Sequence, residues 1–514
     1  MKGETRINIP IYNKPWFDNG LITFYDLLRS INSEIGIGLK LNPQKISFTL
    51  KNTETFLEQL LPEISAVENN LIVIGKEDEN VEKEIKKDFL ILQEGKKVNG
   101  KVRFKEKFYN EELRKSFLKK SVKILGKEGG KRKCIVCGRQ YNVKAGNIKR
   151  YLKLKQSIYP LSTKIKSLSG VRSHGDGTFL RFSKTYHDNL CPLCYMIGAL
   201  NWANRGIVYR TFISDKYSYI LLPNMDNLAE LNEFRNSYLE LLNNESRYSN
   251  IRVEPDKKET ENTAGKYSTL LCFYEKFLFN INIGIICKEW QIMKVPLGNV
   301  KNVSTIEVSI NEDILGVLQN LYDKGIQVYN YFIKRVNFFM DKNIESQKID
   351  WDITNEIREN LSKHFIKDDF YKFARTLMPK RGGHVGYSSN AHEKLGELLY
   401  EWRIKNMNLE KENLEYIKKI GNIIAKTSGT APTLLYKIDK ARNFNDLLDA
   451  LRQVSRKMAG LDKKDIKGKI SPGSFDNLIE ILKTNENNWS EIRNLLVIYS
   501  SMYYSLNKFR DRGE

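Results

Sequence analysis

Histidine is scarce in this sequence, since only five of its 514 residues are histidine. Side chains that exchange protons near neutral pH are therefore few, and no assembled catalytic constellation surrounds them. The phosphate-binding pattern GxxxxGK[ST] is missing as well, and no DExx-like helicase motif accompanies the glycines. These absences exclude the common nucleotide hydrolases and predict a protein that is not an enzyme.

Long apolar runs are also missing. No stretch approaches the roughly 18 uninterrupted apolar residues that cross a membrane. The first residues, Met-Lys-Gly-Glu-Thr-Arg, lack the apolar run of a secretory signal. We therefore expect a cytoplasmic protein with no membrane partner. An apolar content of 41% is enough for globular folding, and a chain of this length is expected to form two to four domains.

Cysteine is rare too, but four of the six cysteines form two CxxC pairs, Cys134–Cys137 and Cys191–Cys194. Each pair places two thiolates on one tight turn, and two pairs complete the four-sulfur set that suits structural zinc. Gly138 follows the first pair, where such a turn often needs a positive φ. In a reducing compartment these pairs favour a metal over a disulfide. The alternative is four buried or redox-active thiols.

Acidic residues are nearly absent between the pairs. From Lys131 to Lys184 there are fourteen Lys or Arg and one acid, Asp176, so this segment carries +13 of the net charge of +22. Tyrosine and phenylalanine are interleaved with the cations, a mixture typical of nucleic-acid-binding surfaces. The candidate contacts are Lys131, Arg132, Lys133, Arg139, Lys149, Arg150, Lys153, Lys155, Arg172, Arg181 and Lys184.

A compositional bias toward lysine could also explain these cations. Residues 54–94 argue against that explanation, because they contain eleven acids and four lysines, a net charge of −7. Charge is thus partitioned along the chain, as expected where one surface meets a polyanion.

The hydrophobic pattern predicts an α+β multidomain fold. Strands are expected at 6–10 and 45–50, a turn at 15–20 and a helix at 21–31. Further on, 207–213 and 217–222 predict a hairpin and 226–243 a helix, whereas 267–310 is ambiguous in period. From about residue 312 the pattern is helical. Two amphipathic stripes near the C-terminus are typical of a helix-bundle core: Phe444, Leu447, Leu448, Leu451, Val454 and Met458; and Ile492, Leu495, Leu496, Tyr499, Met502, Tyr503 and Leu506.

Four domains are predicted from these patterns. They are a mixed α/β N-terminal domain at 1–125, a zinc-knuckle basic insertion at 126–200, an α+β continuation that becomes helical at 201–378, and an all-α helical bundle at 379–514. The clearest late break, at 378–389, contains one proline and several glycines.

An HNH-type nuclease is the sharpest enzymatic alternative, since that fold can carry paired CxxC zinc ligands. His174, His187 and Asn189 all lie between the pairs. Their order is wrong, however, because an HNH site needs histidine, asparagine and then histidine.

A Pro-aromatic-x-Asp-x-Gly segment near the N-terminus is formed by Pro15, Trp16, Asp18 and Gly20. In this segment, in its two CxxC pairs and in its length, the chain resembles the CXXC–CXXC family of CRISPR-associated proteins. Members of that family are large subunits of type I, chiefly I-B, Cascade surveillance complexes, which serve antiviral defence. The helical C-terminal third agrees with the resemblance. Only the cysteine pairs and the N-terminal segment are specific to it.

The resemblance implies a non-catalytic subunit that reads a PAM in double-stranded target DNA, helps open the duplex and holds the displaced strand. Its partners would be the CRISPR RNA, the backbone, handle-binding and small subunits of Cascade, and a recruited helicase–nuclease. Asn13 and Lys14 are weak PAM-proximal candidates that could equally well only shape the turn. The family's C-terminal bundle resembles the separate small subunit. Met378 and Met407 are candidate internal starts for such a product, and Met378 is favoured because it keeps the apolar stripe that follows whole. A zinc-containing nucleic-acid-binding protein unrelated to CRISPR remains the third interpretation.

Overall fold

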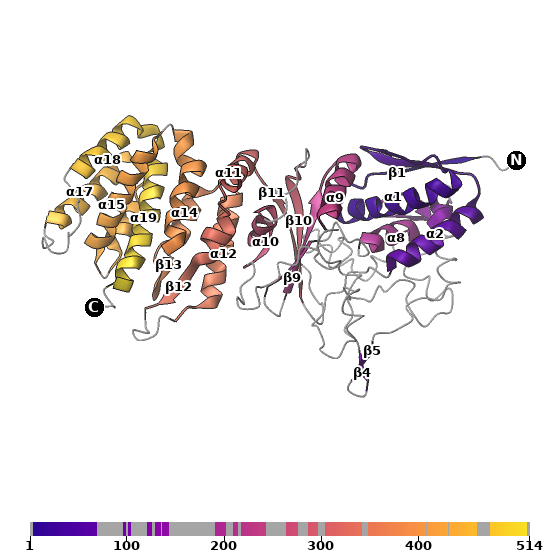
Figure 1. Ribbon diagram of the computed structural model, residues 1–514, viewed down its shortest axis with the longest axis horizontal. Coiled ribbons are helices and arrows are strands. Elements are labelled where there is room, and N and C mark those ends of the chain that lie inside the picture. The colour runs from indigo at the N-terminus through magenta and orange to yellow at the C-terminus, as the bar shows by residue number, and fades with distance from the viewer. Residues whose placement is uncertain are drawn as a thin grey trace. The chain divides into compact units, whose positions relative to one another are not determined.

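The computed structural model describes residues 4–68, 96–98, 101–103, 121–125, 129–134, 136–142, 191–201, 209–213, 217–242, 264–275, 286–296, 304–341, 348–387, 389–407, 409–429, 431–459 and 473–510. The fold is α+β, as predicted, with small antiparallel sheets and a helical C-terminal region (Figure 1). None of the helices in these ranges is both long enough and apolar enough to span a membrane.

Two compact units make up the chain. The first contains Met1–Asn262 and Ile281–Ser309, and the second contains Thr263–Asn280 and Ile310–Glu514. The four ranges drawn from the sequence are a finer division and remain predictions.

The first unit begins with a three-stranded antiparallel sheet in the order β1-β3-β2. Alternate residues of β1, Ile7 and Ile9, are buried against the neighbouring helices, as the period of two requires. The predicted strands at 6–10 and 45–50 and the helix at 21–31 are confirmed. The elements are β1 (Thr5–Pro10), α1 (Pro15–Ile35), β2 (Lys40–Asn42), β3 (Lys45–Leu50) and α2 (Thr53–Glu68).

The predicted turn at 15–20 is wrong, because α1 already begins at Pro15. Proline suits the first helical position, where its missing N–H would have no partner within the helix. Gly20 was read as a turn residue, yet it lies inside the helix and is buried. The reason for glycine there is a close neighbour, helix α8 (Pro192–Leu200), which is described with the metal centre below.

A second sheet of the first unit is antiparallel in the order β11-β10-β9-β8. The predicted hairpin is confirmed as β8 and β9, with Ile213 opposite Tyr217, and the predicted helix at 226–243 is confirmed as α9. The ambiguous stretch 267–310 supplies one helix to the second unit and two strands to this sheet. The elements are β8 (Tyr209–Ile213), β9 (Tyr217–Asn224), α9 (Leu228–Leu242), β10 (Glu289–Pro296) and β11 (Ser304–Ser309). Two short hairpins complete the unit: β4 (Lys96–Val98) with β5 (Lys101–Arg103), and β6 (Arg132–Lys133) with β7 (Gln140–Tyr141).

The second unit is mainly helical, as predicted from residue 312 onward. Its elements are α10 (Lys266–Phe273), α11 (Glu312–Asp323), η5 (Val328–Phe332), η6 (Ile333–Arg335), β12 (Val336–Met340), α12 (Trp351–Ile366), α13 (Phe370–Thr376), β13 (Gly383–Tyr387), α14 (Ser389–Leu399), η7 (Tyr400–Ile404), η8 (Lys405–Met407), α15 (Lys411–Ser428), α16 (Thr433–Asp439), α17 (Phe444–Ala459), α18 (Gly473–Thr484), η9 (Glu486–Asn488) and α19 (Trp489–Arg510).

Helix α19 forms the centre of this unit and packs against α13, α15, α16 and β13. Both predicted stripes face a core, since Leu447, Leu451 and Val454 of α17 are buried together with most of the α19 stripe. Helices α15 and α19 approach closely at Gly421, where a Cβ would lie 2.6 Å from the Cβ of Tyr499. Glycine is required there because the two backbones leave no room for a side chain.

The Pro/Gly break at 378–389 was read as a boundary, but it contains strand β13, which pairs antiparallel with β12. In its described residues the C-terminal region is therefore helical apart from this strand, and the strand's partner precedes the break. All five residues of β13 are buried, so the strand has no alternation of apolar and polar residues that the sequence could reveal.

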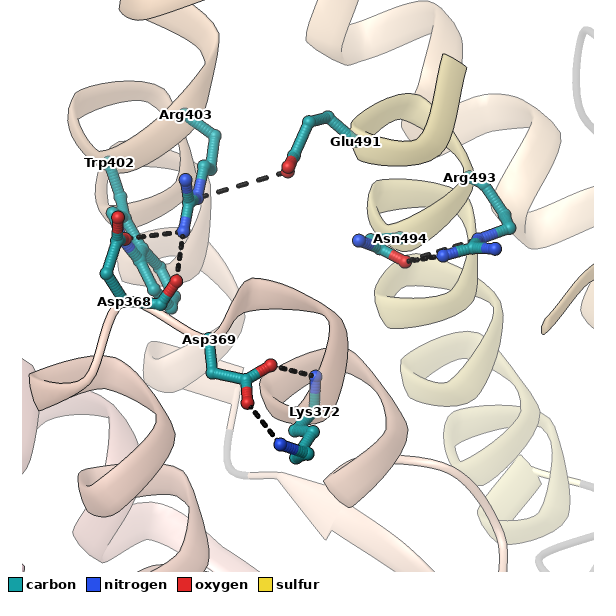
Figure 2. Close-up of polar contacts among 8 residues, drawn as sticks. All are labelled: Asp368, Asp369, Lys372, Trp402, Arg403, Glu491, Arg493 and Asn494. Atoms are coloured by element: carbon teal, nitrogen blue, oxygen red, sulfur yellow. Dashed lines mark hydrogen bonds and ion pairs between the residues drawn. The ribbon is translucent and has the colours of Figure 1, made fainter. Parts of the chain in front are cut away.

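Residues before the break also enclose Trp402 of η7. The rings of Phe365, Phe370 and Phe373, from α12 and α13, meet the indole edge-to-face at 4.7 to 5.1 Å. Its Nε1–H donates to Asp368 at 2.8 Å. Figure 2 shows Asp368 between Trp402 and Arg403, whose guanidinium also faces Glu491 of α19 at 4.0 Å. Segments on both sides of the break thus share one core.

Candidate metal centre and its surroundings

The four cysteines of the two CxxC pairs converge in the first unit. Their sulfur atoms all lie within 4.8 Å of one another, and the Cys137 and Cys191 sulfurs are 3.7 Å apart. A disulfide bond would place two sulfurs about 2.05 Å apart. A tetrahedral ion with metal–sulfur bonds of about 2.3 Å places them roughly 3.8 Å apart. These cysteines could therefore hold one metal ion.

The first pair lies on the turn between β6 and β7. The Cys134 N–H donates to the Arg139 carbonyl at 2.9 Å, and the Gly138 N–H donates to the Cys134 carbonyl at 2.9 Å. Gly138 has a φ of 71°, a left-handed conformation that a side chain would strain. The prediction that this turn needs a glycine after the second cysteine is confirmed.

The second pair lies at the start of α8. The Cys191 N–H donates to the Cys134 sulfur and the Cys194 N–H to the Cys191 sulfur, both at 3.4 Å. Hydrogen bonds from the other cysteine thiols lower the pKa of Cys134, whereas burial raises the pKa of Cys194. Backbone donors aimed at sulfur favour the thiolate form that a metal requires.

Helix α8 is held in place by α1. A Cβ on Gly20 would overlap the Ile197 carbonyl oxygen, so the two helices cross at the closest distance that their backbones allow. Beside this crossing, the Trp16 Nε1–H donates to the Gly198 carbonyl at 3.0 Å. The Pro15–Gly20 segment and the second cysteine pair, two separate motifs in the sequence, are thus neighbours in the fold.

The turn that leads into α1 is organised by Asp18. Its carboxylate accepts the Tyr12 N–H at 2.7 Å and the Lys14 N–H at 2.6 Å. Burial raises the pKa of Asp18 to about 7, against the two backbone donors, which lower it. Asn13 has a φ of 53°, and its side chain is exposed, while Lys14 is half-buried. The turn-shaping role considered for Asn13 and Lys14 is thus visible in the backbone, and their PAM-proximal role stays a prediction.

Two residues with contacts in this part of the first unit were not identified from the sequence. The Tyr12 hydroxyl oxygen lies 3.7 Å from the Cys194 sulfur. Asn19 ties α1 to β9, since its side-chain amide donates to the Pro15 and Pro223 carbonyls at 2.6 and 3.0 Å. The only sequence signal for either residue was its proximity to the Pro15–Gly20 segment.

The predicted basic candidates divide into three groups. Lys131, Arg132 and Lys133 are exposed beside the first cysteine pair. Arg139 instead donates to the Asn8 carbonyl of β1 at 2.7 Å, which fastens the first pair to the N-terminal sheet. The others lie outside the described residues: Lys149, Arg150, Lys153, Lys155, Arg172, Arg181 and Lys184, as do His174, His187 and Asn189.

Comparisons with known proteins return no matching family model and no matching curated protein. The resemblance to the CXXC–CXXC family therefore enters below as a proposal.

Replacing Gly20 with alanine should destabilise the first unit by about 1–3 kcal/mol, the usual cost of overpacking a core. The new methyl group meets a backbone carbonyl, which cannot move aside as a flexible side chain can. Thermal unfolding and the temperature of metal release measure the effect. Gly316→Ala is the matched control, because Gly316 is also helical but a Cβ there meets nothing within 4 Å. Alanine at this exposed helical position should stabilise the second unit by about 1 kcal/mol. Equal melting shifts for the two variants would contradict the close helix crossing.

Proposed function

We propose that Cys134, Cys137, Cys191 and Cys194 bind one structural Zn²⁺. All four ligands are protein sulfurs, so no coordination position is left open for water or substrate. The spacing of the sulfurs supports this proposal, as do the two N–H donors that reach them. Zinc supplies rigidity here and no chemistry.

We further propose that the chain is the non-catalytic large subunit of a type I, I-B-like, CRISPR RNA-guided surveillance complex in the cytoplasm. The observation that carries this proposal is the contact between α1 and α8, because it joins the two motifs on which the resemblance rests. Because both motifs contribute to the same helix contact, there is a physical reason for them to occur in one chain. The helical second unit is consistent with a C-terminal bundle like the small subunit.

In this role the protein would read the PAM, help open the target duplex, hold the displaced strand and dock the helicase–nuclease. Base pairing by the CRISPR RNA would supply the sequence specificity. The exposed cations Lys131, Arg132 and Lys133 beside the metal centre would contact phosphates of DNA or of the RNA.

Purification of the full chain from its native host tests this function. A bound small RNA of uniform length with a repeat-derived 5′ end, together with the other Cascade subunits, supports it. A zinc-loaded protein that carries no such RNA, or only mixed cellular RNA, would instead indicate a nucleic-acid-binding protein unrelated to CRISPR. Cleavage of DNA by the purified chain alone would indicate the nuclease alternative.

Replacing Lys131, Arg132 and Lys133 together with alanine should weaken binding of the assembled complex to target DNA. It should also reduce the slope of log affinity against log salt by about 2–3, because each lost phosphate contact removes roughly 0.7–0.9. Filter binding or anisotropy between 50 and 200 mM salt, the range over which such contacts matter, measures the slope. The control removes the same charge from exposed positions of the second unit, at Lys437, Lys440 and Arg442. If the salt slope changes equally in both variants, the effect comes from net charge alone, and the proposed phosphate contacts of Lys131, Arg132 and Lys133 are contradicted.

A further inference from the structure

The surroundings of the Cys194 sulfur point to a hydrogen-bond donor for the metal centre. Cys194 is fully buried, and Tyr12 is 8% exposed, so water has little access to either group. The hydroxyl oxygen and the sulfur are 3.7 Å apart, within hydrogen-bonding distance for sulfur. The two residues are 182 positions apart in the sequence, so only tertiary packing brings them together.

The donor in this pair depends on the state of the sulfur. A neutral Cys194 thiol donates to the hydroxyl oxygen. A metal ligand must be a thiolate, and metal binding releases the thiol proton to solvent. The sulfur then has lone pairs and no proton, so the Tyr12 O–H becomes the donor.

We propose that Tyr12 is a positioning residue of the metal centre, whose hydroxyl donates a hydrogen bond to the Cys194 thiolate and so fixes and stabilises it as a ligand. This inference rests on the proposed zinc site. Four thiolates around a divalent cation carry a net charge of −2, and in a buried site each hydrogen bond to sulfur offsets part of that charge. The Cys134 and Cys191 sulfurs each accept a hydrogen bond from a backbone N–H, and the Tyr12 hydroxyl would donate the corresponding bond to Cys194.

The position of the Tyr12 side chain is itself fixed. Its backbone N–H donates to the buried Asp18 carboxylate at 2.7 Å, and its ring lies 5.7 Å from that of Phe17. Neither contact involves the hydroxyl. Tyr12→Phe therefore removes only the donor and leaves the turn and the ring packing in place, which makes it a clean test.

Cobalt(II) reports the effect directly, since it occupies tetrahedral sulfur sites and shows thiolate-to-metal charge-transfer absorption. Loss of the O–H donor raises the energy of the sulfur lone pairs, so in Tyr12→Phe the charge-transfer band should move to longer wavelength. The affinity for Zn²⁺, measured by competition with a chromogenic chelator, should fall by about tenfold, the lower end for loss of such a partner. Far-UV circular dichroism should be unchanged.

Tyr25→Phe is the control, because it removes a hydroxyl from helix α1, which follows Tyr12, and Tyr25 packs partly buried against the same apolar core. It should leave both the band and the affinity as in the wild type. Site-specific Tyr12→3-fluorotyrosine makes the hydroxyl a stronger donor and should shift the band in the opposite direction.

The results of the cobalt titrations distinguish the proposed role of Tyr12 from the proposed metal centre. A charge-transfer band that is identical in the wild type and in Tyr12→Phe overturns the role of Tyr12 and leaves the metal centre standing. A similar shift in Tyr25→Phe also overturns it. A wild-type chain with no charge-transfer band on titration with Co²⁺ overturns the metal centre and the role of Tyr12 together.

Discussion

Replacing Cys191 with serine should reduce bound metal from about one ion per chain to less than a tenth. Cys191 is completely buried, its sulfur lies 3.7 Å from that of Cys137, and its N–H reaches the Cys134 sulfur. A serine hydroxyl does not ionise at neutral pH and cannot replace a thiolate ligand. A structural zinc site is closed by four protein ligands, so the three remaining sulfurs should not retain the metal.

The loss of structure in Cys191→Ser should be confined to the surroundings of the metal centre, and it should differ between the two cysteine pairs. The first pair lies on a hairpin of two-residue strands and depends on the metal, with Arg139 and Asn8 as an additional tie. Helix α8 is held by α1 through Trp16 and the crossing at Gly20. Hydrogen exchange should therefore rise strongly in residues 129–142, less in 191–201, and not at all in the second unit. Elemental analysis gives the metal content.

Cys287→Ser serves as the control for this experiment. Cys287 is buried in the first unit too, and its thiol donates to the Glu289 carbonyl, a bond that serine can also make. This variant should keep its metal. Retention of a full equivalent of metal by Cys191→Ser would contradict the proposed centre. Equal exchange in residues 129–142 and α8 would contradict the anchoring of α8 by α1.

A fragment that begins at Met378 should fail to fold on its own. It would lack β12, the partner of β13, and the three phenylalanines that enclose Trp402. It would also lose α13, which packs on the central helix α19. A single large-to-small change of an aromatic core residue costs about 3–5 kcal/mol, and this truncation removes several such contacts at once.

The contacts of Arg403 also indicate that the fragment beginning at Met378 should not fold. Its guanidinium lies 4.9 Å from the Phe370 ring and donates to Asp368 at 2.5 Å, and both residues precede Met378 (Figure 2). In the fragment this cation would keep only Glu491 as a charged neighbour among these residues. Arg403 is half-buried, so the loss of Asp368 and Phe370 removes contacts that offset the cost of withdrawing this cation from water.

The comparison is between fragment 378–514 and fragment 264–514 with a Gly/Ser linker in place of residues 281–309, because the longer one then contains every described residue of the second unit and none of the first. We expect 264–514 to be monodisperse with a cooperative thermal transition and 378–514 to aggregate. A soluble 378–514 with a cooperative transition would show that the helices form a separable subunit after all. The packing thus opposes Met378 as the start of an independent product, contrary to the boundary favoured from the sequence.

Most local elements of this protein were predictable from the sequence. The strands at 6–10 and 45–50 alternate, the hairpin at 207–222 has a short polar turn, and the C-terminal stripes repeat at helical spacing. The errors came where a distant neighbour decides the local structure. Gly20 resembles a turn residue until α8 is present to require it, and the strand after Pro379 is recognisable only beside β12.

The same distinction applies to the candidate site. The sequence by itself determined the turn of the first cysteine pair, because its CxxC spacing and the glycine at 138 specify a knuckle through contacts among neighbouring residues. Tertiary structure decided that the two pairs meet, that Arg139 binds the N-terminal sheet, that the Tyr12 hydroxyl lies beside Cys194, and that Trp16 binds the helix that carries this cysteine. The physical reason is the separation of the interacting residues along the chain. The geometry of a turn depends on a few adjacent dihedral angles. The tertiary contacts join residues more than 50 positions apart, and they form only when an apolar core brings the segments together.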